Sequence, residues 1–185
     1  MRRRSNRHRR GTSADSLRDP CEELLAATPD DLAPIRELLA ELSLPAADVG
    51  AENQRFVVAR ARGELVGCAA LELYGSGALL RSLAVRAAMQ GRGLGHALYE
   101  RVMANAAGAG VTDVFLLTTS AERFFARQGF RRIAREDVPD RVRASAEFAS
   151  LCPATAVCMA RRVGGRPDAS DLPRSRPGGP TCRDT

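Results

Sequence analysis

The sequence predicts a single domain of mixed α/β (α+β) class, and three patterns support this prediction. Short apolar stretches separated by glycine-containing turns run through residues 56–85, as in an antiparallel meander. A glycine-spaced turn over residues 90–95 leads from the last of these stretches into apolar positions with helical spacing. A further apolar stretch, residues 111–119, follows that helix and has the composition of a strand buried on both faces.

The first predicted helix begins at Thr28. This residue can cap a helix, Pro29 suits a first turn, and the acidic pair Asp30-Asp31 favours the positive end of the helix dipole. Leucine or isoleucine at positions 32, 35, 38, 39 and 42 forms one apolar face. We expect the helix to end at Leu44-Pro45 and residues 46–54 to form a loop.

The remaining elements are expected in the following order along the chain. Three strands over residues 56–59, 65–74 and 79–85 are joined by turns at 60–64 and 75–77. The central helix begins at Leu94 and stops at Gly108 or Gly110. The later elements are a strand at 111–119, a helix at 121–128, a strand at 130–133, a helix at 137–149 and a last strand at 155–163.

Charge and composition limit the classes of partner. The net charge of +6 arises mostly from residues 1–20, which hold seven Arg and two Asp. We expect a disordered basic tail at 1–20, a folded domain at 21–163 and a disordered tail at 164–185. No aromatic residues are interleaved with the arginines and no apolar run reaches about 18 residues, so neither a nucleic acid nor a membrane is expected as a partner.

The five cysteines form no C-x-x-C pair, and their number is odd. A disulfide framework or a structural zinc site is therefore not expected. Unpaired thiols of this kind fit a reducing cytoplasm. The sequence predicts no bound metal.

The turn Gln90-Gly91-Arg92-Gly93-Leu94-Gly95 has the features of a phosphate-binding loop. Glycines allow close approach of the backbone to a ligand, and the helix that starts here directs unpaired N–H groups and a positive dipole toward an anion. The alternative is a tight strand-to-helix turn whose glycines serve packing alone. The spacing differs from the dinucleotide fingerprint G-x-G-x-x-G, and a P-loop is excluded because the chain has no lysine.

The pattern Gln-x-x-Gly-x-Gly after a strand and at the start of a helix resembles the acetyl-CoA pyrophosphate loop of the GNAT superfamily of N-acetyltransferases. Phe124-Phe125-x-x-x-Gly129-Phe130 resembles a later helix and strand of the same superfamily, and the likeness covers roughly residues 28–163. Four stretches resemble, more narrowly, the GNAT proteins associated with arsenic resistance: residues 71–75, 79–85, 116–119 and 147–153.

This resemblance implies the GNAT fold, with helices on both faces of a mixed, mostly antiparallel sheet that splays apart between its fourth and fifth strands. It also implies acetyl-CoA as cosubstrate, with the pantetheine arm along the opened strand edge and the pyrophosphate on the loop. The residues implied in cosubstrate binding are Leu83, Ala84, Val85, Gln90, Gly91, Arg92, Gly93, Leu94, Gly95, Thr119, Phe124 and Phe125.

Two charged residues in the predicted strands are candidates for chemistry. Glu72 alternates with Leu71 and Leu73, and a carboxylate beside a dry site is a candidate general base. The alternatives are a solvated glutamate or an ion-pair partner of Arg81. Arg81 interrupts an apolar strand and must be paired, either with an acceptor carboxylate, phosphinate or arsinate or with an internal acid; both can hold at once.

The acceptor pocket is expected to include Tyr74, Thr118, Ser150 and Cys152. Many GNAT enzymes carry a tyrosine that protonates the departing thiolate in the helix where this chain has Phe124-Phe125. Phenylalanine cannot donate a proton, so water or a hydroxyl from Thr118, Thr119 or Ser120 is expected to serve.

The expected function is acetylation of the amino group of a small anionic amino-acid-like compound. The arsenic-resistance resemblance implies an organoarsenical such as arsinothricin, or its phosphorus analogue phosphinothricin. One alternative is a different acceptor, such as a protein N-terminus or another metabolite amine. Another is a non-catalytic CoA-binding or arsenic-binding protein that uses Cys152 and Cys158. A homodimer is expected by analogy with the superfamily.

Overall fold

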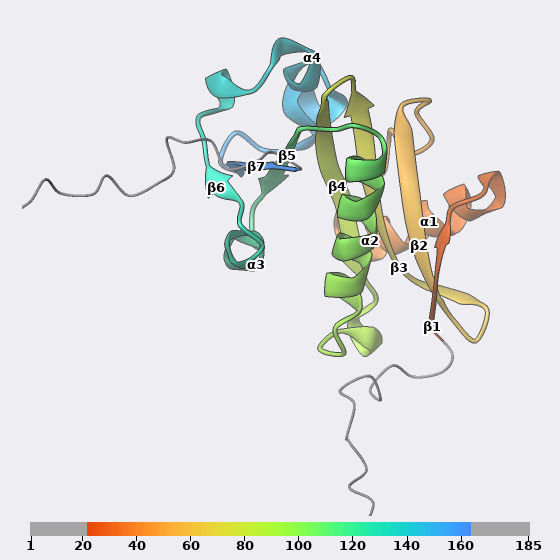
Figure 1. Cartoon of the computed structure of the whole chain (residues 1–185). Coiled ribbons are helices and arrows are strands. Elements are labelled where there is room, and N and C mark those ends of the chain that lie inside the picture. The colour runs from red at the N-terminus through yellow and green to blue at the C-terminus, as the bar shows by residue number, and fades with distance from the viewer. Residues whose placement is uncertain (1–21, 164–185) are drawn as a thin grey trace, which may run out of the picture.

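The computed structural model describes residues 22–163 (Figure 1). The predicted tails at 1–20 and 164–185 lie outside the described residues. Within the described part, none of the helices has the length and hydropathy needed to cross a bilayer.

A seven-stranded sheet forms the centre of the fold, with the order β1-β2-β3-β4-β5-β7-β6. Every neighbouring pair is antiparallel except β4 and β5, which are parallel. This confirms the predicted mixed, mostly antiparallel α/β architecture. The strands are β1 Glu22–Ala26, β2 Gln54–Ala61, β3 Glu64–Tyr74, β4 Gly77–Val85, β5 Asp113–Thr118, β6 Arg131–Arg132 and β7 Val157–Arg162.

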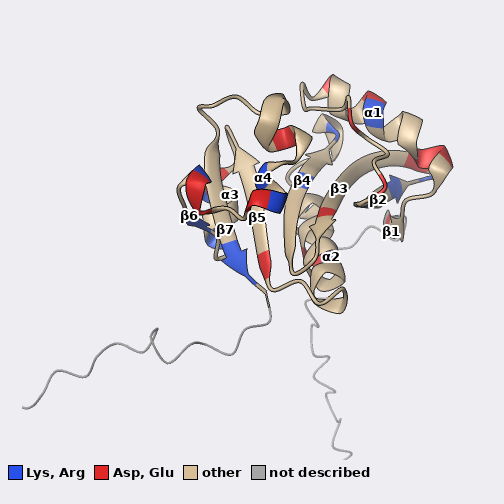
Figure 2. Cartoon of the chain, turned by 90° about the horizontal axis from the view of Figure 1, so that it is seen from above, with Lys and Arg blue, Asp and Glu red and all other residues tan. Residues whose placement is uncertain are grey.

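Two helices cover opposite faces of the sheet, α1 (Leu32–Glu41) and α2 (Leu94–Gly108), as the view from above shows (Figure 2). Alternation along the strands divides the core between them. Val58 of β2 packs with α1, whereas its neighbour Val57 packs with α2. The sheet thus lies between two apolar layers, and this burial is the main source of stability.

The start of α1 confirms the predicted helix entry. A short 3-10 turn, Pro29–Asp31, precedes the helix. Asp31 Oδ2 accepts hydrogen bonds from the Thr28 backbone N–H at 2.7 Å and from the Thr28 hydroxyl at 2.9 Å. These bonds pair groups that the helix end would leave unsatisfied. The helix ends at Glu41, a few residues before the predicted Leu44-Pro45.

The prediction of one continuous helix over residues 137–149 is wrong. The segment contains a 3-10 turn Arg135–Asp137, the short helix α4 Asp140–Arg143 and a π turn Glu147–Leu151. Pro139 stands at the N-cap of α4 and, having no backbone N–H, starts a new helix there. Val142 of α4 is buried against β4 and β5, so tertiary packing fixes the position of this short helix.

Two further elements, β1 and β6, differ from expectation. Residues 22–26 form β1, a strand that the sequence analysis did not assign, because EELLA shows no alternation. It pairs with β2 alone. The strand at 130–133 shrinks to the two residues of β6. The helix predicted at 121–128 forms as α3, Glu122–Arg127.

Candidate functional site

The sheet opens between β4 and β5. The two strands pair at only three positions, the last being Leu79 with Phe115, although β4 continues to Val85 and β5 to Thr118. Beyond that pair, the facing edges of the two strands have no ladder bonds to each other. The predicted separation of the fourth and fifth strands is therefore present, and it leaves backbone N–H and C=O groups available to another molecule.

A cavity of about 610 Å³ occupies this opening. The two strand edges form its walls, the segment after α1 covers one side, and the π turn closes another. The residues that line it are Ser43, Leu44, Pro45, Ala46, Ala47, Leu80, Arg81, Ser82, Leu83, Leu116, Leu117, Thr118, Thr119, Ser120, Ala121, Phe125, Glu147, Leu151, Cys152 and Pro153.

A β-bulge shapes the β4 wall of the cavity. The register with β3 shifts between Cys68, which faces Ala84, and Ala70, which faces Arg81. Two residues of β4, Ser82 and Leu83, thus lie opposite one residue of β3. Ser82 has a φ of 54°, in the left-handed region that is costly for a residue with a side chain. The bulge bends the strand and changes which backbone groups face the cavity. The sequence contains no glycine here that would have indicated it.

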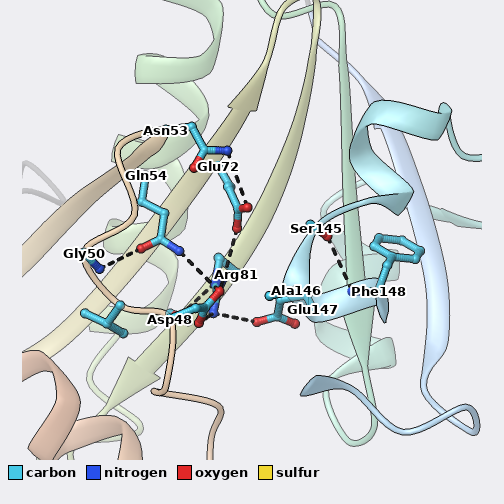
Figure 3. A network of polar contacts seen from close by, with 12 residues as sticks. Asp48, Gly50, Asn53, Gln54, Glu72, Arg81, Ser145, Ala146, Glu147 and Phe148 are labelled. Carbon is cyan, nitrogen blue, oxygen red and sulfur yellow. Dashed lines mark hydrogen bonds and ion pairs between the residues drawn. The ribbon is translucent and has the colours of Figure 1, made fainter. Parts of the chain in front are cut away.

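Arg81 lies at the centre of a network of three carboxylates (Figure 3). Its side chain is almost fully buried. Nη1 donates to Glu72 Oε2 at 2.9 Å and to Asp48 Oδ2, and Nη2 donates to Asp48 Oδ1 at 2.6 Å. The third acid, Glu147, places Oε1 3.2 Å from Nη2. One guanidinium thus faces three acids, so the cluster has an excess of negative charge when all of them are ionised.

These acids also stabilise the charged form of Arg81. Burial alone would lower the pKa of its guanidinium, but the hydrogen bonds to Asp48 and Glu72 and the charge of Glu147 raise that pKa above its usual range. The internal ion pair with Glu72, one of the two alternatives for Arg81, is therefore present.

Glu72 is held on both of its carboxylate oxygens. Oε1 accepts from the Tyr74 hydroxyl and from Asn53 Nδ2 at 3.4 Å, and Oε2 accepts from Arg81. It is buried, so the solvated alternative is wrong, and it lies on the face opposite Leu71 as strand alternation predicted. Neither Glu72 nor Tyr74 is among the residues that line the cavity.

Tyr74 is fixed against Glu72 in its neutral form. Burial, and then the hydrogen bond to Glu72, raises the pKa of the phenol to about 12. The hydroxyl therefore stays protonated and acts as the donor in its hydrogen bond to the Glu72 carboxylate.

Asp48 comes from the loop that follows α1, and the loop is held in place locally. Gln54 Oε1 accepts from the Gly50 N–H at 3.0 Å, and Gln54 Nε2 lies 3.5 Å from Asp48 Oδ2. The predicted loop at 46–54 thus contributes a charged side chain to the cluster.

Glu147 begins the π turn and Cys152 follows its last residue, and both line the cavity. The Cys152 thiol donates to Glu147 Oε2 at 3.0 Å, and the Cys152 N–H donates to the Glu147 carbonyl at 3.0 Å. Burial, and then the hydrogen bond to Glu147, raises the pKa of the Cys152 thiol to about 12. A protonated thiol is a poor nucleophile and a poor metal ligand.

Two glycines of the glycine-spaced turn have left-handed backbone conformations. Gly91 and Gly93 have φ of 77° and 85°, and a Cβ built on either would meet no atom within 4 Å. Gly93 is the N-cap of α2, whose next residue, Leu94, is buried in the core. Gln90 Nε2 donates to the Val85 carbonyl at 2.8 Å, so this side chain braces the turn against the end of β4.

The other predicted site residues fall into two groups. Leu83, Thr118, Thr119 and Phe125 line the cavity, and the Thr118 hydroxyl accepts from the Ala121 N–H at 2.9 Å. Phe124 packs edge-on against Tyr99 and Phe125 instead. The predicted residues that do not line the cavity are Glu72, Tyr74, Ala84, Val85, Gln90, Gly91, Arg92, Gly93, Leu94, Gly95, Phe124 and Ser150.

Sequence reasoning missed Asp48, Ser82 and Glu147. Glu147 lies within the stretch 147–153 used for the family resemblance, so an acid at its first position could have been weighed with Cys152. Asp48 follows an apolar stretch in a loop and carries no local pattern. Among residues 22–163, no group of three or more His, Cys, Asp or Glu side chains is arranged to hold a metal ion.

Comparison with known protein families gives one match. Residues 52–132, from β2 through β6, match the family model described as acetyltransferase (GNAT) domain. The matched region contains the meander, the glycine-spaced turn, α2 and β5. It ends before α4, the π turn and β7.

Two curated relatives match parts of the chain. The uncharacterized N-acetyltransferase CT2212 of Chlorobaculum tepidum is 36% identical over 88 residues, which cover 47% of this chain and 56% of the relative. The amino-acid acetyltransferase of Mycobacterium tuberculosis is 43% identical over 72 residues, which cover 38% of this chain and 41% of the relative. The chain thus spans about half the length of the curated relatives it matches.

One solved structure aligns over nearly all of its own length with three quarters of this chain. It is the crystal structure of Rv2747 from Mycobacterium tuberculosis in complex with CoA and NLQ. The two superpose with a TM-score of 0.64 at 27% identity, covering 75% of this chain and 97% of that one.

Proposed function

We propose that the chain transfers the acetyl group of acetyl-CoA to the primary amine of a small amino-acid-like acceptor, because residues 52–132 match the acetyltransferase (GNAT) domain model. The observation that carries the proposal is the cavity of about 610 Å³ between the separated strands β4 and β5. Bound acetyl-CoA would supply a thioester carbonyl there, and the chain would bind, orient and deprotonate the amine.

The described residues fit acetyl-CoA at two places. The free backbone groups of β4 near Leu83 suit the amides of the pantetheine arm, which would extend the open strand edge. The turn around Gly91 and Gly93 is open to solvent and precedes the N-terminus of α2. Unpaired N–H groups and the helix dipole suit the pyrophosphate at that position.

The acid cluster around Arg81 suits the amine end of an acceptor. Its excess negative charge attracts an ammonium group into the inner part of the cavity. Arg81 is already bound by Asp48, Glu72 and Glu147. An anionic group of the acceptor would share this guanidinium with Glu147, whose contact at 3.2 Å is the longest of the three ion pairs.

The anionic acceptor is the finer part of the proposal. The name of the Mycobacterium tuberculosis relative, amino-acid acetyltransferase, supports an amino acid as the class of acceptor. Arsinothricin and phosphinothricin belong to that class, and their support is the sequence resemblance alone. A protein N-terminus or another metabolite amine would use the same amine end of the cavity.

A non-catalytic role in metalloid binding has weaker support. Burial raises the pKa of the Cys158 thiol to about 11, and that of Cys152 is about 12. Metalloids bind thiolates, and these thiols retain their protons at neutral pH. Replacing both cysteines by serine should therefore leave any arsenic resistance conferred by the protein intact.

Two measurements test the proposed function. Calorimetric titration of the full chain with acetyl-CoA should give saturable binding. Release of free thiol should then be measured with glutamate, glutamine, arsinothricin, phosphinothricin and a peptide with a free N-terminus, and the acetylated product identified by mass. An absence of acetyl-CoA binding, or binding without thiol release for every amine, would refute acetyl transfer to these acceptors.

A further inference from the structure

The carboxylates around Arg81 differ in their access to the cavity. Among the described residues that line the cavity, Glu147 is the one carboxylate. Glu72 accepts from Tyr74, Asn53 and Arg81 outside the lining, and Asp48 accepts from both terminal nitrogens of Arg81. Glu147 is therefore the acid that an acceptor in the cavity would meet.

The two oxygens of Glu147 retain capacity for a further proton donor. Oε1 faces Arg81 Nη2 at 3.2 Å, and Oε2 accepts from the Cys152 thiol at 3.0 Å. A carboxylate has about four lone-pair sites, so one partner on each oxygen leaves room for an ammonium N–H. Glu72 has less capacity, because Oε1 already accepts two hydrogen bonds.

Building on the proposed function, we propose that Glu147 is the general base that takes a proton from the acceptor's ammonium group before the amine attacks. The step conserves protons. The ammonium transfers one proton to the Glu147 carboxylate, and the neutral nitrogen forms the new C–N bond to the acetyl carbon. The C–S bond then breaks, and the second proton of the nitrogen passes to the departing thiolate. Glu147 returns its proton to solvent.

The surrounding titratable groups would position Glu147 for this transfer. They are Arg81 of β4, Asp48 of the loop after α1, Glu72 of β3 and Cys152, which follows the π turn. Arg81 holds Oε1, and its raised pKa keeps it charged through the neutral and moderately alkaline range. The Cys152 thiol stays protonated in the same range and so remains a donor to Oε2.

The test uses the full chain and whichever amine of the panel gives the fastest thiol release with the wild type. Glu147→Gln keeps the size of the side chain and removes its basicity. We expect kcat/KM at pH 7 to fall by about 100-fold or more, as for loss of a general base. Acetyl-CoA affinity should stay within about threefold of the wild type. The matched control is Glu136→Gln, an exposed glutamate just before α4, which should have wild-type kinetics.

Two readouts separate a base from a structural residue. The ratio of wild-type to Glu147→Gln rates should shrink as the pH rises from 7 toward 10, because a neutral amine needs no base. Added formate should partly restore Glu147→Ala, in which the shortened side chain leaves space for a small carboxylate. Wild-type rates in Glu147→Gln, or a loss that is constant with pH and not relieved by formate, would overturn the assignment. An inactive wild type would instead refute the proposed function.

Discussion

Arg81 binds Asp48 through both of its terminal nitrogens, with Nη2 donating to Oδ1 at 2.6 Å and Nη1 donating to Oδ2. This two-point contact joins the central strand β4 to the loop after α1. It fixes the orientation of the guanidinium as well as its position. The same guanidinium then reaches Glu72 and Glu147, so one buried cation organises acids from three separate parts of the chain.

Loss of Arg81 should leave its three acids without their cation. We expect Arg81→Ala to lower the free energy of unfolding by about 3–5 kcal/mol, the range for breaking a buried ion pair. Acetyl transfer should fall as well, while the folded fraction keeps its acetyl-CoA affinity. Urea unfolding and calorimetry measure these effects, and Arg127→Ala, an exposed arginine of α3, is the control. Stability equal to wild type would contradict the network described here.

The glycine-spaced turn allows a matched comparison. Gly93 and Gly63 have φ of 85° and 83°, and a Cβ at either position would meet open space. Alanine should therefore cost about the same stability at both, roughly 1 kcal/mol from left-handed strain. Only Gly93→Ala should weaken acetyl-CoA binding, because Gly63 lies in the β2–β3 hairpin. Equal acetyl-CoA affinities in the two variants would show that the turn does not bind the cosubstrate.

The bulge at Ser82 should respond to the shape of the side chain. Ser82→Gly removes left-handed strain of about 1–2 kcal/mol and adds flexibility to the unfolded chain, so we expect a neutral or stabilising effect. Ser82→Val should destabilise, because β-branched residues are outliers at a φ of 54°. Chemical denaturation measures both. The same pair of changes at Ser76, which is exposed and lacks a positive φ, should differ much less.

The thiols of the described residues should react slowly with alkylating agents at pH 8. Burial raises the pKa of Cys68 from its ordinary value of 9.0 to about 12, and it raises the pKa values of Cys152 and Cys158 to about 12 and about 11. Above pH 9 the folded state therefore holds thiol protons that the unfolded state has lost. The contribution of these thiols to the free energy of unfolding is complete below pH 9 and declines as the pH rises toward 11–12. Iodoacetamide labelling followed by mass spectrometry checks this, with Cys152→Ser to assign its peptide. Rapid native labelling at pH 8 would contradict the burial.

Asp31 should contribute stability that acid removes. Burial alone would raise its pKa, but the hydrogen bonds from Thr28 and the charge of Arg60 lower the pKa below its ordinary value of 3.8. Its contribution is thus present above pH 3.8 and is lost as the pH falls through the lower, folded-state value. Asp31→Asn should cost about 1–2 kcal/mol at pH 7, the size of a helix-cap loss, and little at pH 2. Urea unfolding at the two pH values measures the difference.

Part of the candidate site follows from local sequence rules. Strand alternation placed Glu72 opposite Leu71, and a cation inside an apolar strand required Arg81 to be paired. The turn before α2 followed from the spacing of its glycines, whereas the left-handed φ of Gly91 and Gly93 was seen only in the structure. These rules concern residues near one another in the chain, where the geometry of a strand or a turn is nearly fixed.

Local sequence patterns are enough to predict the α/β class, the meander, the cap at Thr28 and the glycine-spaced turn, because each depends on periodicity or on the conformational limits of single residues. The three-dimensional fold was needed to show that Asp48 and Glu147 reach Arg81, that β4 bulges at Ser82 and that residues 137–149 divide into a short helix and turns. These features depend on contacts between segments far apart in the chain, and such contacts form when burial brings the sheet, the loop and the π turn together.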